Sequence, residues 1–159
     1  MTVILHNIRS AYNVGSLFRT ADAFGCARLI LCGITPGPLD RFQRENTRVT
    51  KVSLGAEKNV PWTRARAFED AVNQCRAEEI SVYALEQDPR AVLLANLNTI
   101  SRPWHSLALA VGPEVDGFTQ EDLRLTDQII EIPIFGAKES LNVSVAFGIA
   151  AYHFRMLCH

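Results

Sequence analysis

The sequence predicts one α/β domain in which helices flank a mostly parallel β-sheet, and three observations point to this fold class. The chain has 159 residues, 48% of them hydrophobic, which suits a single compact domain over residues 1–159. Short runs rich in Val, Ile and Leu alternate with segments of helical length. These runs are apolar at successive positions, as expected of strands that are covered on both faces.

Five of the runs are predicted as strands because each is short and dominated by branched aliphatic residues. In chain order they are residues 2–5, 29–31, 82–85, 107–111 and 129–132. Ligands of such sheets bind at the carboxyl ends of the strands, so the segments that follow the strands are the candidates for a functional site.

The first helix is predicted directly after the first strand, with Asn13 as its N-terminal cap and Gly25 at its C-terminal end. Gly15 permits close approach of the backbone and leaves free N–H groups to which an anion could bind. Arg19 lies off the apolar face and is placed to reach a phosphate or a carboxylate, although a solvated surface arginine is the alternative. The apolar face consists of Val14, Leu17, Phe18, Ala21 and Phe24.

A second amphipathic helix is predicted over residues 67–79, and its role is expected to be structural. Its apolar side chains recur at helical spacing and are Phe68, Ala71, Val72 and Cys75.

The segment from residue 141 to residue 157 is predicted as a helix whose apolar residues point in nearly every direction, with Ser140 as its N-terminal cap. A helix that is apolar all round must be buried all round, and the sheet can cover only one face. We therefore predict that a second copy of the chain covers the other face in a homodimer. Polar residues such as Asn142 and His153 interrupt the run, so no membrane span is expected.

The net charge of −1 gives no global signal for nucleic-acid binding, but the charges are unevenly distributed. Residues 1–58 carry eight Lys and Arg against four Asp and Glu, and basic residues are frequent over residues 41–66. Two interpretations stay open: an ordinary solvated face, or a local patch that binds phosphates.

The four cysteines show no C-x-x-C spacing and no paired histidine cluster, so no metal site is predicted. They are expected to be small buried hydrophobic residues in a reducing compartment.

The N-terminus lacks the pattern of a signal peptide, so the protein is expected to be cytoplasmic. The sequence also lacks G-x-G-x-x-G, G-x-x-x-x-G-K-[ST] and G-x-S-x-G, which leaves dinucleotide enzymes, P-loop NTPases and serine hydrolases without motif support.

Two further segments are candidates for chemistry. The strand over residues 107–111 ends in Gly112-Pro113-Glu114, where the glycine lets the main chain line a pocket and Glu114 lies at the rim. An ordinary turn is the alternative. The second segment precedes the last helix, where a cap explains Ser140 but leaves Asn142 unexplained, since its amide can both donate and accept hydrogen bonds.

Together, three segments resemble the three motifs of the SpoU (TrmH-like) family of RNA ribose 2′-O-methyltransferases, in the SPOUT superfamily. They are Asn13-x-Gly15-x3-Arg19-Thr20-Ala21-Asp22-Ala23-Phe24-Gly25, Val111-Gly112-Pro113-Glu114-x-Asp116-Gly117, and Ile132-Pro133-x2-Gly136-x3-Ser140-Leu141-Asn142-Val143-Ser144-x-Ala146.

The resemblance covers essentially the whole chain and implies a C-terminal part threaded into a deep trefoil knot. Its loops would hold S-adenosylmethionine in a bent conformation, and two subunits would complete each active site. The catalytic positions of the family fall on Arg19, Asn13, Glu114, Ser140 and Asn142. Its cofactor loops fall on Leu85, Glu86, Val111, Gly112, Ile132, Pro133, Ile134 and Leu141.

The resemblance also implies methylation of a ribose 2′-hydroxyl in RNA, with Arg19 gripping the adjacent phosphate and orienting the hydroxyl. The expected substrate is transfer RNA, with ribosomal RNA second. A non-catalytic RNA-binding protein of the same fold and a base-modifying SPOUT enzyme remain the alternatives. No separate RNA-binding extension is recognisable, so RNA would be held by the dimer surface, including the basic stretch over residues 41–66.

Overall fold

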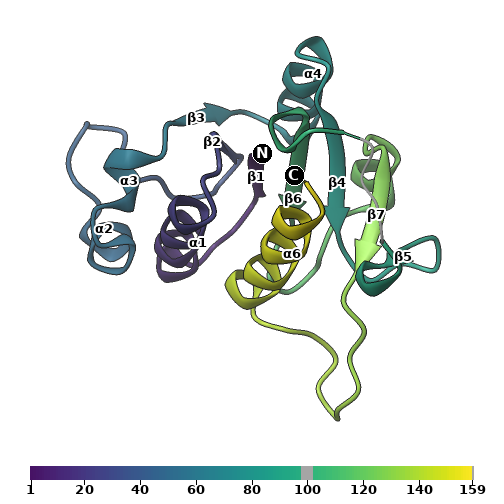
Figure 1. The fold of residues 1–159 in the computed structure, drawn as a ribbon. Coiled ribbons are helices and arrows are strands. Elements are labelled where there is room, and N and C mark those ends of the chain that lie inside the picture. Colours follow the sequence, from purple (N-terminus) through teal and green to yellow (C-terminus); the bar gives the residue numbers. More distant parts are fainter. Residues whose placement is uncertain (98–101, 159) are drawn as a thin grey trace.

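The computed structural model describes residues 1–97 and 102–158 (Figure 1). The elements follow one another as β1 (Thr2–His6), α1 (Ala11–Ala23), β2 (Arg28–Cys32), α2 (Thr47–Ser53), α3 (Ala56–Asn59), β3 (Trp62–Ala65), α4 (Phe68–Ala77), β4 (Ser81–Leu85), β5 (Val92–Leu93), the 3-10 turns η1 (Leu94–Asn96) and η2 (Trp104–Ser106), β6 (Leu107–Val111), α5 (Gln120–Arg124), β7 (Gln128–Glu131) and α6 (Val143–Leu157).

The seven strands form one sheet in the order β3-β2-β1-β6-β4-β7-β5, and each pairing between these strands is parallel. The predicted α/β class and its mostly parallel sheet are therefore confirmed. All five predicted strands are present, with ends shifted by no more than a residue. Two strands were missed, β3 and β5, and both lie at the edges of the sheet.

The sheet has a layer of helices on each face (Figure 1). Val3, Leu5 and Leu109 point toward the core that contains the apolar sides of α1 and α6. Ile4 and Ala110, their neighbours along the strands, point toward the opposite core, which α4 and α5 cover. Both faces of the central strands are thus excluded from solvent, as the apolar runs of the sequence require.

Helix α1 is capped by Ser10, not by Asn13 as the sequence suggested. The hydroxyl oxygen of Ser10 accepts a hydrogen bond from the N–H of Asn13 at 3.3 Å. Gly25 ends the helix with φ +65°, as predicted. Capping by Ser10 leaves the Asn13 side chain free for other partners.

Gly15 lies inside α1 and does not form an anion-binding helix start, which corrects the prediction. A Cβ atom at this position would lie 2.6 Å from the carbonyl oxygen of Val49 and 2.8 Å from the Cβ of Val52. Both are residues of α2, so the missing side chain of Gly15 allows the two helices to touch.

Helix α6 packs one apolar face on the sheet and exposes the other. Phe147, Ala150, Ala151 and Phe154 are fully buried. The exposed face is made of Val145, Ile149, Tyr152 and Met156, which are 43 to 57% exposed and recur at helical spacing. Helix α6 therefore carries apolar side chains on its buried face and on its exposed face, as the sequence predicts. In residues 1–97 and 102–158, no helix has the length and apolar character needed to cross a bilayer.

Replacing Gly15 by Ala should destabilise the domain because the new methyl group would collide with the backbone of α2. Overpacking of this kind costs about 1–3 kcal/mol. Urea unfolding followed by circular dichroism measures the change. Gly136→Ala is the matched control, since a Cβ there meets no atom within 4 Å. Equal stability of the two variants would mean that α1 and α2 can separate without cost.

Candidate functional site

The loops that follow β4, β6 and β7 enclose, with the first turn of α6, a pocket of about 190 Å³ that we call the loop pocket. Leu85 ends β4 and pairs with Val111 of β6 and with Ile130 of β7, so the three strands end at one level. The loop pocket therefore lies at the carboxyl edge of the sheet, where ligands of this fold class bind.

The loop pocket brings together most of the residues that the sequence singled out. Every residue expected at the cofactor loops lines it except Pro133, and Glu114 and Ser140 line it as well: Leu85, Glu86, Val111, Gly112, Ile132, Ile134, Leu141, Glu114 and Ser140.

Glu86 holds the turn that forms one wall of the loop pocket. Its Oε2 atom accepts a hydrogen bond from the N–H of Phe118 at 2.9 Å, and its Oε1 atom accepts one from the N–H of Gln87 at 2.9 Å. Gly117 in this turn has φ +64°, and a Cβ there would lie 2.5 Å from Oε2 of Glu86. Glycine is therefore favoured at this position, because it adopts the left-handed conformation without strain and leaves room for the Glu86 carboxylate.

Glu114 is the central acceptor of a hydrogen-bonded network beside the loop pocket. Its Oε2 atom accepts from the N–H of Arg9 at 3.0 Å, and its Oε1 atom accepts from the N–H of Ser10 at 3.2 Å and from Nδ2 of Asn13 at 3.0 Å. One carboxylate thus joins the turn after β6 to the start of α1.

The network continues from Asn13 to the start of α6. The Oδ1 atom of Asn13 accepts a hydrogen bond from Nδ2 of Asn142 at 3.1 Å. The Oδ1 atom of Asn142 in turn accepts from the N–H of Ser144 at 2.9 Å and from its hydroxyl at 2.6 Å. Three segments that are distant in the sequence are therefore connected through Glu114, Asn13 and Asn142.

Asn142 caps α6, and Ser140 does not, which corrects the prediction. The physical reason is position, because α6 begins at Val143 and the residue before it supplies the capping oxygen. Ser140 is instead an exposed residue at the rim of the loop pocket. Figure 1 shows the segment between β7 and α6, to which Ser140 belongs, projecting from the body of the domain.

The network holds Glu114 as a carboxylate. Partial burial alone would raise its pKa, but the hydrogen bonds from Arg9, Asn13 and Ser10 outweigh this effect and lower the pKa below the usual 4.5. Glu114 is therefore an acceptor at neutral pH and not a proton donor.

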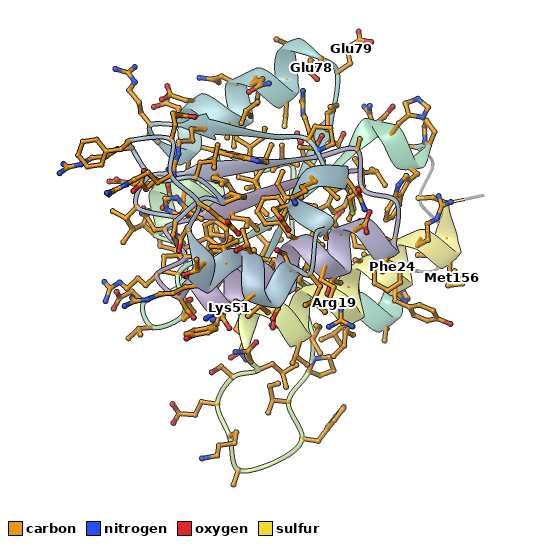
Figure 2. All side chains as sticks on the ribbon, turned by 90° about the vertical axis from the view of Figure 1, so that its left-hand side faces the viewer. Arg19, Phe24, Lys51, Glu78, Glu79 and Met156 are labelled. Atoms are coloured by element: carbon orange, nitrogen blue, oxygen red, sulfur yellow. The ribbon has the colours of Figure 1, made fainter. Side chains whose placement is uncertain are left out.

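Arg19 is not brought to the loop pocket of its own chain. Its side chain is exposed on α1, and it is absent from the residues that line the pocket. Figure 2 shows Arg19 on the side of the molecule that also carries Lys51 of α2. Its helix neighbours Thr20 and Phe24 lie against Gly148 and Tyr152 of α6, so Arg19 emerges close to the exposed apolar face of α6.

Sequence reasoning missed several contributors to the site. The N–H groups of Arg9 and Ser10 carry no sequence signal, although a serine before a helical pattern indicates a cap. Gln87 donates a hydrogen bond from Nε2 to the carbonyl oxygen of Glu139 at 2.8 Å, which ties the loop pocket to the segment before α6. Ser144, two residues after Asn142, fits the spacing of a capping contact and could have been identified.

The basic stretch over residues 41–66 does not form one uniform patch. Arg64 is engaged by the main chain, since it donates to the carbonyl oxygen of Thr35 at 3.1 Å, and Arg66 lies 3.6 Å from the carboxylate of Asp70. All four cysteines are buried and free, as expected. Among the described residues, no group of three or more His, Cys, Asp and Glu is arranged to hold a metal ion.

Comparisons with known proteins agree with one another. The sequence model of the SpoU rRNA Methylase family matches residues 1–152. A 23S rRNA (guanosine-2′-O-)-methyltransferase, RlmB, from Escherichia coli (strain K12) is 30% identical over 150 residues, which are 94% of this chain and 57% of the relative. The chain thus spans little more than half the length of this relative.

Two solved structures share the fold. An AdoMet-bound rRNA methyltransferase from Sinorhizobium meliloti has a TM-score of 0.85 and 29% identity, over 98% of this chain and 55% of that one. A structure described as giving insights into the 2-OH methylation of C/U34 on tRNA has a TM-score of 0.78 and 25% identity, over 98% of this chain and 95% of that one.

Replacing Glu114 by Gln should lower the free energy of unfolding at pH 7 by about 1–3 kcal/mol, because the new NH₂ group faces an N–H donor. Since the folded pKa of Glu114 lies below 4.5, its stabilisation is present above that pH and is lost as the pH falls through the folded pKa. Urea unfolding at several pH values should therefore show the difference from wild type shrinking below pH 4.5. Glu139→Gln, at an exposed position, is the control; a pH-independent difference for Glu114→Gln would contradict the network.

Proposed function

Because the chain belongs to the SpoU rRNA methylase family, we propose that it transfers a methyl group from S-adenosylmethionine to a ribose 2′-hydroxyl in RNA. The observation that carries the proposal is the loop pocket, since it gathers the predicted cofactor residues from three separate loops and adjoins the Glu114 network. We also propose that residues 1–159 form one methyltransferase domain and that its C-terminal part is threaded into the trefoil knot of the family.

The chemistry of the loop pocket fits S-adenosylmethionine. Leu85, Ile132 and Leu141 offer apolar surface for a flat base, while Glu86 and Glu131 place carboxylates at a pocket that would receive a cation. When bound, the cofactor supplies a methyl group on a positively charged sulfur, which is activated for displacement by an oxygen nucleophile.

The residues of the chain would position the reacting hydroxyl. The hydrogen bonds among Glu114, Asn13 and Asn142 fix the start of α6 beside the loop pocket, and Ser140 at the rim lies where a ribose would enter. Holding the hydroxyl in line with the methyl group supplies much of the rate enhancement in such a reaction.

Arg19 is proposed to grip the phosphate next to the target ribose and to orient the 2′-hydroxyl. A guanidinium is normally protonated, so the hydroxyl proton leaves through that phosphate or to a transiently neutral guanidine. Because Arg19 does not line the loop pocket of its own chain, it would act at the pocket of a second copy.

The proposed homodimer places a second chain on the exposed face of α6. Four apolar side chains stand there at helical spacing, next to the residues of α1 that flank Arg19. Covering them removes apolar surface from water and carries Arg19 toward the partner.

The proposed substrate is transfer RNA. The proposal is supported by the likeness to the structure concerned with methylation of C/U34 on tRNA, with a TM-score of 0.78 and 25% identity. Ribosomal RNA is the second candidate, supported by the 30% identity to that enzyme. A non-catalytic RNA-binding protein would not need Asn13, Arg19, Glu114 and Asn142 together.

Replacing Arg19 by Ala should lower methyl transfer by about a hundredfold or more, because the reacting hydroxyl loses its alignment. Cofactor affinity, measured by calorimetry with S-adenosylmethionine, should stay nearly unchanged. Turnover is measured by mass spectrometry of 2′-O-methylated nucleosides in tRNA and in rRNA after incubation with the cofactor. Arg124→Ala, at an exposed position of α5, is the control.

Two outcomes would contradict this scheme. Full activity of Arg19→Lys would show that a planar, two-pronged grip is not needed. A wild-type protein that neither binds S-adenosylmethionine nor methylates either RNA would refute the proposed function.

Replacing Ile149 by Glu should dissociate the dimer, because a charge would be buried against the partner. Light scattering coupled to gel filtration should then give the mass of one chain instead of two. Ile34→Glu is the control, since Ile34 is also exposed but lies outside α6. A wild-type protein that elutes as a monomer, or an unchanged mass for Ile149→Glu, would exclude this interface.

A further inference from the structure

The segment between β2 and α2 contains a rigid turn that displays an aromatic ring. Residues 39 and 45 form an antiparallel bridge, and the N–H of Asp40 donates to the carbonyl oxygen of Arg44 at 2.9 Å. The Oδ1 atom of Asp40 accepts from the N–H of Phe42 at 2.7 Å and from the N–H of Arg44 at 3.0 Å. Hydrogen bonds within the turn itself thus hold its backbone in place.

Phe42 at the tip of this turn is 60% exposed. The guanidinium groups of Arg41 and Arg44 lie 4.7 and 5.0 Å from the centre of its ring. We call these three residues the Arg-Phe-Arg platform. A single exposed apolar side chain is ordinary on a protein surface, but a hydrogen-bonded turn that holds two guanidinium groups within 5.0 Å of the centre of one ring is a specific arrangement.

A cavity of about 570 Å³ separates the turn from the start of α1, and we call it the flanking pocket. Arg9 and Tyr12 line it from the side of α1, and Arg48 lines it from α2. Tyr12 is 61% exposed and is a second aromatic surface, which lines the flanking pocket. Asp40 also lines the pocket, but its carboxylate is occupied by Nε of Arg44 at 2.9 Å.

The flanking pocket adjoins the candidate site. Arg9 and Ser10 line the flanking pocket, while their N–H groups bind the carboxylate of Glu114, which lines the loop pocket. The two pockets therefore share one wall, and an extended chain that leaves the candidate site can continue into the flanking pocket.

We propose that the Arg-Phe-Arg platform and the flanking pocket bind an unpaired segment of RNA beside the nucleotide that is methylated. One base stacks on Phe42 and a neighbouring base on Tyr12, while Arg9, Arg41 and Arg48 contact the phosphates between them. The inference rests on the proposed function, because it concerns how the same substrate is held.

The chemistry favours unpaired RNA over a duplex. Bases in a duplex stack on one another and cannot reach a protein ring, whereas splayed bases stack on aromatic and guanidinium planes. An incoming base can displace a guanidinium from Phe42, because an exposed cation–π contact contributes less than base stacking. The displaced cation remains beside the phosphates. Stacking is tolerant of sequence, so the platform adds affinity without selecting a base.

Fluorescence anisotropy with two labelled RNAs tests the inference: a hairpin with a loop of about seven unpaired nucleotides, and a blunt duplex of the same mass. Phe42→Ala should weaken binding of the hairpin by about 5- to 150-fold and leave binding of the duplex unchanged. Phe42→Trp should restore the affinity. Leu54→Ala is the matched control, since Leu54 is 68% exposed at the end of α2.

The dependence of RNA affinity on salt concentration distinguishes the contribution of base stacking from that of the charged contacts to phosphates. Arg41→Ala should reduce the slope of log affinity against log salt by about one, and Arg124→Ala should not, because α5 covers the opposite face of the sheet. Circular dichroism and calorimetry with S-adenosylmethionine establish that the variants are folded.

The inference is overturned if Phe42→Ala binds the hairpin as tightly as Leu54→Ala does, or if it loses equal affinity for the duplex. Either result, obtained with a wild-type protein that methylates RNA, leaves the proposed function intact. A wild-type protein that methylates RNA but binds the hairpin no more tightly than the duplex would also overturn the inference, whereas only the loss of both cofactor binding and methylation would refute the proposed function.

Discussion

The carboxylate of Glu114 is the acceptor on which the arrangement of the candidate site depends. It binds the N–H groups of Arg9 and Ser10 and the amide of Asn13, and through Asn13 it fixes Asn142 at the start of α6. The three donors to Glu114 all lie at the start of α1: the N–H of Arg9 just before the cap, the N–H of the cap Ser10, and the side chain of Asn13 in the first turn. A charged acceptor that satisfies several donors at once forms stronger hydrogen bonds than neutral partners would. Its ionised state therefore matters to the geometry of the whole edge of the sheet.

This network is possible only because β1 and β6 are neighbours in the centre of the sheet. Leu5 pairs with Val111, so the turn after β6 and the segment after β1 leave the sheet side by side. The next strand, β4, pairs with β6 at the same level and contributes its own loop. The site is therefore set by strand order and register, and the loops add the chemistry to positions that the sheet has already fixed.

The central elements of the fold could be predicted from the sequence, because buried strands and amphipathic helices leave strong apolar patterns. The edge strands β3 and β5 could not, since β3 has no buried residue and only two apolar ones, and β5 has two residues. The order of the strands also carries no local signal. At the start of α1 and of α6, two residues compete for the role of cap, and local spacing cannot decide between them. Ser10 caps α1 because the helix begins at Ala11, and the side chain of Asn13 in the first turn instead binds Glu114, a partner that no local pattern reveals.

The hydrogen bond between Asn13 and Asn142 joins residues 129 positions apart in the chain. Contacts of such long range are slow to form, because the ordering of the intervening chain must come first. During synthesis, α1 leaves the ribosome long before α6 exists, so Asn13 cannot form this hydrogen bond until Asn142, 129 residues later, has been translated. A truncated product would consequently have most of the sheet and an incomplete site.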